Sequence, residues 1–253
     1  MVNGIYVAAS SMASQAENLE AIAGNLANLS TAGYKRDVPA FSDLLKESLA
    51  PALTPTISDT GVVTIGDTTY PEIVQPIITV DLQDGSLRGT SNPFDLAVQG
   101  PGFLVVQTPE GEAYTRNGAL TIKKDGYLAT HNGYPVLGEG GTIRLNGTDW
   151  QVAANGEVTV EGAVAGRLRL VGIPAESVRR IGDSLVLSAT EPTALDWADS
   201  QVKQGFLEQS NVNAIGEMIS LIATMRIFEA NQKVIQAEDE TLSKAVNQVP
   251  QVL

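Results

Sequence analysis

The chain has few side chains of the kinds that perform catalysis or bind metals. Among its 253 residues are one histidine, His131, and no cysteine. It therefore has no thiol nucleophile, no disulfide and no metal site built from several histidines or thiolates. His131 lies beside the turn dipeptide Asn132-Gly133, away from any serine in a nucleophile-elbow context, and we interpret it as a surface turn residue.

One hydrolytic motif is left as an alternative. Asp59-Thr60-Gly61 has the residue order of an aspartic-protease loop, and that mechanism needs two carboxylates that share a proton. The motif occurs once, and Val62 follows it where a hydroxyl would be needed to hydrogen-bond the carboxylate. We favour an ordinary turn, with a hydrolase acting through Asp59 as the alternative.

The other candidate sites fit turns better than chemistry. Two aspartate pairs, each three residues apart, lack the dense run of oxygen ligands of a calcium loop, and a glycine-rich stretch lacks the Lys-Ser/Thr of a phosphate loop. These are Asp81 and Asp84, Asp196 and Asp199, and Gly138-Glu139-Gly140-Gly141. We therefore expect no catalytic residue, no metal and no cofactor, and the chain is not expected to be an enzyme.

Charge and hydropathy exclude some classes of binding partner. A net charge of −13 opposes binding to nucleic acid and to anionic membrane surfaces. No uninterrupted apolar segment approaches the roughly 18 residues that span a bilayer, so direct membrane insertion is not expected. The first residues enter an amphipathic pattern at once, which predicts that no signal peptide is cleaved.

The distribution of proline and glycine divides the chain into three. Eleven of the 12 prolines and 19 of the 24 glycines lie from Pro39 to Pro192, and the last proline is Pro250. Because proline interrupts helices, both end segments are open to long helices and the middle is rich in turns.

Both end segments carry apolar heptads. In the first, Ile5, Met12, Leu19 and Leu26 recur every seven residues, and the helix is expected to stop near residues 29–33. In the second, expected over residues 212–247, the same spacing relates Leu221, Phe228, Ile235, Leu242 and Val249, with Met218, Ile222, Met225 and Val246 widening the stripe. Neither helix can bury its stripe alone, so it must pair within the chain or with another subunit.

The middle predicts antiparallel β structure. Short β-branched or alternating segments, such as residues 103–108 and 157–160, are separated by six Asn/Asp-Gly dipeptides able to take the positive φ angles of tight hairpins. The expected fold class is α+β, in which the long N- and C-terminal helices form a coiled-coil-like pair and the central part of the chain forms a mostly antiparallel β domain. The expected segments are an N-terminal assembly helix (1–35), an extended connector (36–79), the β domain (80–203) and a C-terminal assembly helix (204–253).

Three stretches together resemble the axial proteins of the bacterial flagellum, a family that includes the rod and hook proteins. The first and last stretches resemble the terminal signatures of the family, and the second resembles the start of its β domain. They are Asn25-Leu26-Ala27-Asn28-Leu29-Ser30-Thr31-Ala32-Gly33-Tyr34-Lys35; Asn92-Pro93-Phe94-Asp95-Leu96-Ala97-Val98-Gln99-Gly100 with Gly102-Phe103 and Tyr114-Thr115-Arg116-Asn117-Gly118; and Gly205-Phe206-Leu207-Glu208-Gln209-Ser210-Asn211-Val212-Asn213.

Within that family the chain looks most like the proximal-rod type. It is short, and residues 114–118, 133–141 and 166–170, together with Tyr6, look like that type. Residues 211–213 are equally at home in the distal-rod type, which is the alternative.

The resemblance implies a structural subunit that assembles with copies of itself and with other rod and hook proteins to transmit torque. It also implies export by the flagellar type III apparatus, assembly into the rod that crosses the periplasm, and packing of the end helices as the inner layer of a tube. The expected assembly residues are Ile5, Met12, Leu19, Ile22, Leu26, Leu221, Ile222, Phe228, Ile235 and Leu242, and the family-motif residues are Asn25, Asn28, Thr31, Gly33, Tyr34, Ser210, Asn211 and Asn213. A different class, an extracellular β-domain binding module oligomerised by its helical ends, stays open.

Overall fold

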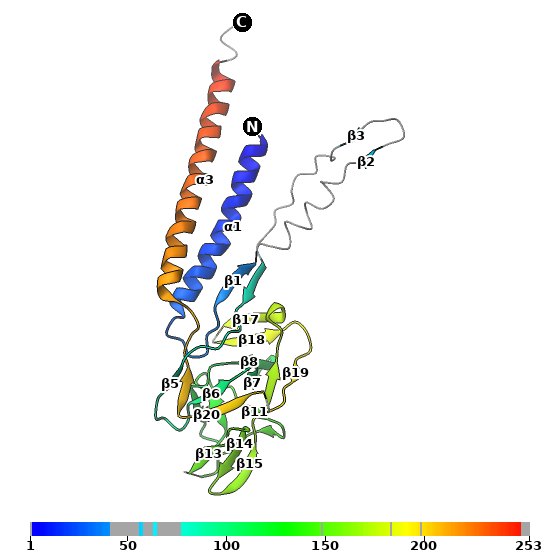
Figure 1. Ribbon diagram of the computed structural model, residues 1–253, viewed down its shortest axis with the longest axis vertical. Coiled ribbons are helices and arrows are strands. Elements are labelled where there is room, and N and C mark those ends of the chain that lie inside the picture. The colour runs from blue at the N-terminus through cyan, green and yellow to red at the C-terminus, as the bar shows by residue number, and fades with distance from the viewer. Residues whose placement is uncertain are drawn as a thin grey trace. The chain divides into compact units, whose positions relative to one another are not determined.

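The computed structural model describes residues 2–40, 56–57, 63–64, 77–147, 149–182, 184–197 and 199–248 (Figure 1). Its long helices are α1 (Val2–Ala27) and α3 (Ala214–Gln248), close to the predicted spans. Every strand pairing with a described register between them is antiparallel. The α+β class is thereby confirmed.

The strands between the helices are short. Their bounds are β1 (Asp37–Ala40), β2 (Thr56–Ile57), β3 (Val63–Thr64), β4 (Ile77–Val80), β5 (Leu87–Gly89), β6 (Leu96–Gln99), β7 (Phe103–Thr108), β8 (Gly111–Thr115), β9 (Leu120–Ile122), β10 (Leu128–Thr130), β11 (Leu137–Gly138), β12 (Gly141–Thr142), β13 (Trp150–Val152), β14 (Glu157–Val160), β15 (Ala163–Arg167), β16 (Leu170–Gly172), β17 (Val178–Gly182), β18 (Leu185–Ser188), β19 (Thr193–Ala194), β20 (Gln201–Gln204) and β21 (Phe206–Glu208). A 3-10 turn, Ala175–Ser177, precedes β17.

The chain forms two compact units, each built from separated segments. The first contains Met1–Gly24, Asp37–Ile78 and Ile215–Leu253, and so most of α1 and nearly all of α3. The second contains Asn25–Arg36 and Thr79–Ala214, which include nearly all the β structure. The division into four consecutive segments stays a prediction.

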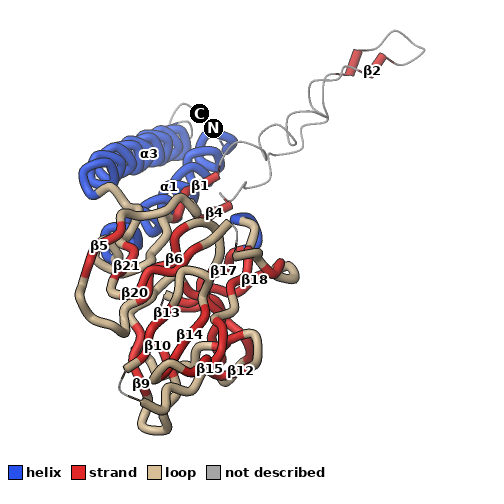
Figure 2. Tube along the Cα trace, turned by 60° about the horizontal axis from the view of Figure 1, so that its bottom comes forward, coloured by secondary structure: helices blue, strands red, loops and turns tan. Residues whose placement is uncertain are grey.

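In the first unit, α1 and α3 lie side by side and run antiparallel (Figures 1 and 2). One described hydrogen bond joins them, from Asn231 Nδ2 to Ser11 Oγ at 2.9 Å. No helix among the described residues is both long and apolar enough to cross a membrane.

The second unit is organised around β7. β7 lies within a six-stranded sheet of order β17-β18-β8-β7-β16-β19, and the other described sheets have two or three strands. Successive side chains of a strand point to opposite faces, so Leu104 and Val106 join one buried cluster while Phe103 and Val105 join another. Burial on both faces explains why β7 has a continuous apolar run, and each such side chain contributes about 1.5–3 kcal/mol.

The prediction for the Asn/Asp-Gly dipeptides was right for only half of them. Gly126, Gly133 and Gly156 have positive φ angles, whereas Gly85, Gly118 and Gly147 do not. Gly118 is needed for space, because a Cβ there would lie 1.5 Å from the backbone oxygen of Leu96. The dipeptide therefore marks a positive φ angle at some sites and, at Gly85 and Gly118, a close approach of another backbone segment.

Candidate functional site: the junction of the motif segments

Three segments that are far apart in the sequence meet within the second unit. They are residues 25–36, which end α1 and lead away from it; Arg116, just after β8; and residues 208–213, which run from β21 towards α3. The loop between β4 and β5 completes the junction. These are the segments that carry the family-like motifs.

The Glu208 carboxylate is the centre of the junction. Its Oε1 accepts hydrogen bonds from Lys35 Nζ at 2.7 Å and from the Gly85 backbone N–H at 2.9 Å. Its Oε2 accepts one from Arg116 Nη1 at 3.2 Å. The Glu208 side chain is only 1% exposed and those of Lys35 and Arg116 only 3%, so water contributes little to their solvation.

The cluster is balanced in charge. Asp84, whose side chain is 45% exposed, lies 3.6 Å from Lys35 Nζ and 3.7 Å from Arg116 Nη2, so two cations face two carboxylates. Backbone carbonyls take further donors: Lys35 Nζ donates to Gln83 O at 2.8 Å, and Arg116 Nη1 donates to Val98 O at 3.0 Å. Buried charges are tolerated when paired and hydrogen-bonded in this way, so the cluster ties three segments together.

This cluster was missed as a site by the sequence analysis. Lys35, Arg116 and Glu208 stand in the motif stretches but were not singled out, because Glu208 is separated from Lys35 by 173 positions and from Arg116 by 92. Asp84 was interpreted as a solvated turn carboxylate. It is half-exposed, but it also accepts the Gly100 N–H at 3.1 Å and faces both cations.

Asn211 makes a second set of links in the junction. Its Oδ1 accepts the Arg36 N–H at 2.7 Å, and its Nδ2 donates to the carbonyls of Asp81 at 3.0 Å and Gln83 at 3.1 Å. A side chain that both donates and accepts is required, and an amide meets that requirement where a carboxylate does not.

Gly33 and Tyr34 explain the glycine-aromatic pair of the first motif. Gly33 has φ +67°, and a Cβ there would lie 2.2 Å from the Arg116 carbonyl, so both backbone conformation and space favour glycine. The buried Tyr34 hydroxyl donates to Asn25 Oδ1 at 3.3 Å, and the Arg180 guanidinium lies 4.2 Å above the Tyr34 ring.

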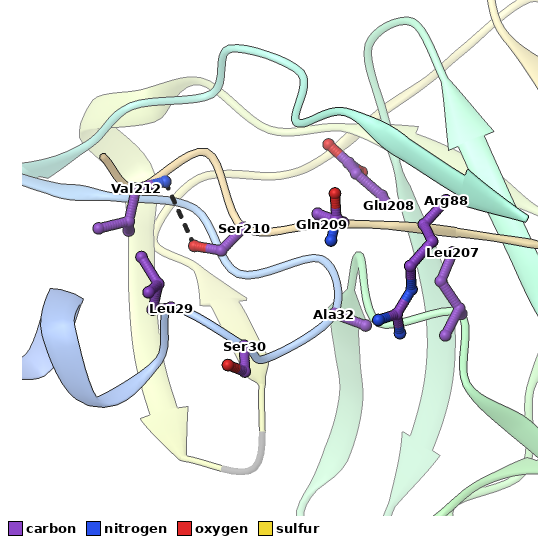
Figure 3. A pocket seen from close by; sticks show the side chains of 9 residues that line it. All are labelled: Leu29, Ser30, Ala32, Arg88, Leu207, Glu208, Gln209, Ser210 and Val212. Carbon is purple, nitrogen blue, oxygen red and sulfur yellow. Dashed lines mark hydrogen bonds between the residues drawn. The ribbon is translucent and has the colours of Figure 1, made fainter. Parts of the chain in front are cut away.

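The remaining motif residues stabilise local turns. Thr31 Oγ1 donates to Asn28 Oδ1 at 3.1 Å, and Ser210 Oγ accepts the Val212 N–H at 3.3 Å, the bond drawn in Figure 3. Asn213 immediately precedes α3, which begins at Ala214.

A cavity of about 350 Å³ opens beside the junction (Figure 3). It is lined by the first motif segment, by Arg88 of β5 and by residues 207–210 and 212. The Glu208 carboxylate is already bonded to Lys35 and Arg116, and the lining has no histidine to act as a base. The described residues that line the cavity therefore offer no free acid–base pair.

The predicted assembly residues lie in varied surroundings. Ile22 is buried and Ile222 is 55% exposed. Those that are partly buried are Met12, Leu19, Leu26, Leu221, Phe228 and Ile235. The side chains of Ile5 and Leu242 lie outside the description.

Two residues were weighed as catalytic candidates, His131 and Asp59. His131 is exposed just after β10, and Asp59 lies outside the described residues. In the described parts of the chain no three His, Cys, Asp or Glu residues gather as a metal site. Burial raises the pKa of Tyr114, with Glu112 adding to the increase and Arg169 opposing it.

A long antiparallel helix unit, and a β unit whose charged junction ties the two terminal motifs together, are typical of a structural protein. Family models match in three places: "Flagella basal body rod protein" over residues 5–35, "Flagellar hook protein FlgE/F/G D1 domain" over 97–160, and "Flagellar basal body rod FlgEFG protein C-terminal" over 203–249.

Full-length relatives agree with these models. The chain is 32% identical to flagellar basal-body rod protein FlgG of Caulobacter vibrioides, over 95% of this chain and 97% of that protein. It is 34% identical to flagellar basal-body rod protein FlgF of Escherichia coli, over 97% of each. The chain belongs to the flagellar basal-body rod protein family and is a structural rod subunit.

Proposed function

We propose that this rod subunit assembles through its helical unit. In the proposal α1 and α3 pair as an antiparallel coiled coil, which packs against copies of the chain and against homologous rod and hook proteins to transmit torque. Family membership supports those partners, export by the flagellar type III apparatus, and a place in the part of the rod that crosses the periplasm.

The observation that carries the proposal is an exposed apolar stripe on α3. Ile215, Met218, Ile219, Ile222 and Met225 are between 49% and 72% exposed. At about 100° per residue they lie on one face, which is centred roughly 105° around the helix from the face that contains Leu221 and Phe228. Burying each side chain against a neighbour would contribute up to about 1.5–3 kcal/mol, so the stripe favours assembly.

The test replaces part of this stripe with polar residues. Ile222→Ser with Met225→Ser should abolish incorporation into rods, and with it motility, while the isolated protein keeps its circular dichroism spectrum. The matched control is Ile227→Ser with Val234→Ser, whose side chains are 47% and 49% exposed but lie on another face of α3. Normal rods with the stripe variant, or equal failure of the control, would count against the proposal.

Within the flagellar rod, we propose that this subunit occupies the proximal part. The resemblance of residues 133–141 and 166–170 to the proximal type supports it. The relatives include proteins named FlgG and proteins named FlgF at similar identity, so the distal position is the alternative. Cross-linking in intact basal bodies, followed by identification of the neighbouring subunits, tests the position.

A further inference from the structure

Burial along α3 follows a strict heptad. From residue 222 to residue 241 every described position is exposed except Thr224, Phe228, Asn231, Ile235 and Glu238. Their spacing alternates between four and three residues, which places them on the single face expected of a helix in a two-stranded coiled coil. We call these five positions the seam.

The seam has one apolar row and one polar row. Phe228 and Ile235 are seven residues apart and form the apolar row predicted from the sequence. Thr224, Asn231 and Glu238, also seven apart, form the other row, in positions that coiled coils normally fill with apolar residues. We call them the polar row.

Helix α1 presents a matching polar set. Asn231 Nδ2 donates to Ser11 Oγ, which fixes one opposed pair. The two helices run antiparallel (Figure 1). Counting from the Ser11–Asn231 pair, seven residues forward along α1 and seven back along α3 therefore bring Asn18 to the level of Thr224. Asn18 is 7% exposed and Thr224 9%, so this level is buried, more deeply than the partly buried Ser11–Asn231 level.

The polar row is costly. Among the described residues, Asn18 Oδ1 and Glu238 Oε2 are buried without a hydrogen-bond partner. Leucine in such positions would remove that cost and bury more apolar surface. Polar residues that lower the stability of the helix pair are best explained by the alternative helix registers that they exclude.

We infer that the polar levels Ser11–Asn231 and Asn18–Thr224 set the register of α1 against α3. A slip of half a heptad would put Asn18 at the level of Leu221 or Phe228 and would leave its amide against an apolar side chain. Buried polar residues at single coiled-coil positions are known to fix register in this way, at a cost in stability. The inference rests on the helix pairing proposed above.

The test measures register directly, using the absence of native cysteine from the chain. Ala8 is three residues before Ser11, and Ile235 is four after Asn231, so Ala8→Cys with Ile235→Cys reports the observed register. Ala8→Cys with Glu238→Cys reports a half-heptad slip, because residues 235 and 238 are about 4.5 Å apart along the helix. The ratio of the two disulfide yields, under mild oxidation of the purified full chain, is the readout.

The test variant, Asn18→Leu with Thr224→Leu, removes the polar level Asn18–Thr224. We expect it to lower the ratio of in-register to slipped disulfide about tenfold and to raise the thermal midpoint of unfolding. The matched control, Glu20→Leu with Gln232→Leu, adds two leucines at exposed positions and should leave the ratio unchanged.

Each other outcome overturns the inference. An equal ratio of the two disulfide yields with and without the Asn18–Thr224 level would show that the polar levels do not set register. If the Asn18→Leu, Thr224→Leu variant is less stable than the unmodified chain, or if the control changes the disulfide ratio as much, the leucines act in some other way than by removing the polar level. If neither cysteine pair forms a disulfide in any background, the helix pairing itself fails, and that result is distinct from loss of register.

Discussion

Glu208 should contribute more to stability than any other charged side chain of the junction. Glu208→Gln keeps the size of the side chain but removes the negative charge, and leaves Lys35 and Arg116, both 3% exposed, facing only the half-exposed Asp84. Breaking a buried ion pair by removing one partner typically costs about 3–5 kcal/mol. We therefore expect the free energy of unfolding to fall by about that amount.

The assay is urea unfolding of the purified full-length chain, followed by tryptophan fluorescence and circular dichroism. Asp84→Asn is the matched control, because it removes the same charge from a side chain that is 45% exposed and more than 3.5 Å from both cations. Solvent screening limits that loss to about 1 kcal/mol or less. A Glu208→Gln loss no larger than the Asp84→Asn loss would refute the view that a desolvated charge cluster holds the junction together.

Three further predictions concern single residues. Gly33→Ala should destabilise the chain by well over about 1 kcal/mol, because it adds a clash with the Arg116 carbonyl to the cost of a positive φ angle. The control, Gly205→Ala, has φ +80° and no atom within 4 Å of the added Cβ, so it should show only the conformational cost. Equal thermal midpoints for the two variants would contradict this account. Asn211→Asp should cost about 2 kcal/mol in chemical unfolding, since it removes two donated hydrogen bonds, and a neutral result would mean that they contribute nothing. The pKa of Tyr114 is raised in the folded state, so the stability that its neutral hydroxyl contributes is fully present below the unfolded pKa of about 10 and is lost as pH rises through the folded pKa. Tyr114→Phe should therefore reduce the loss of unfolding free energy between neutral and alkaline pH, measured by urea denaturation. An unchanged dependence of that free energy on pH would argue against this account.

The sequence determined the classes of element and their order. The concentration of proline from Pro39 to Pro192, together with seven-residue spacing at both ends, predicted α1 and α3 within a few residues. The apolar run of residues 103–108 predicted β7 with both its bounds correct. These features are local, because they depend on propensity and periodicity within a single segment.

The sequence did not determine which apolar rows of α3 would be covered. Met218, Ile222 and Met225 were expected to widen the heptad stripe, yet in the single chain they are about half-exposed, while polar Thr224 and Asn231 lie in the seam. A helix with apolar residues on more than one face offers several seams, and its partner decides which of them is buried.

The charge cluster depended on tertiary structure most of all. Lys35, Arg116 and Glu208 come from three separated parts of the chain, and nothing in their local sequence reveals that they meet. A buried carboxylate is stable only when folding brings compensating cations and amide donors within hydrogen-bonding distance. Short-range pattern therefore specified the helices and strands, whereas the electrostatic cost of burying charge is balanced only in the assembled junction.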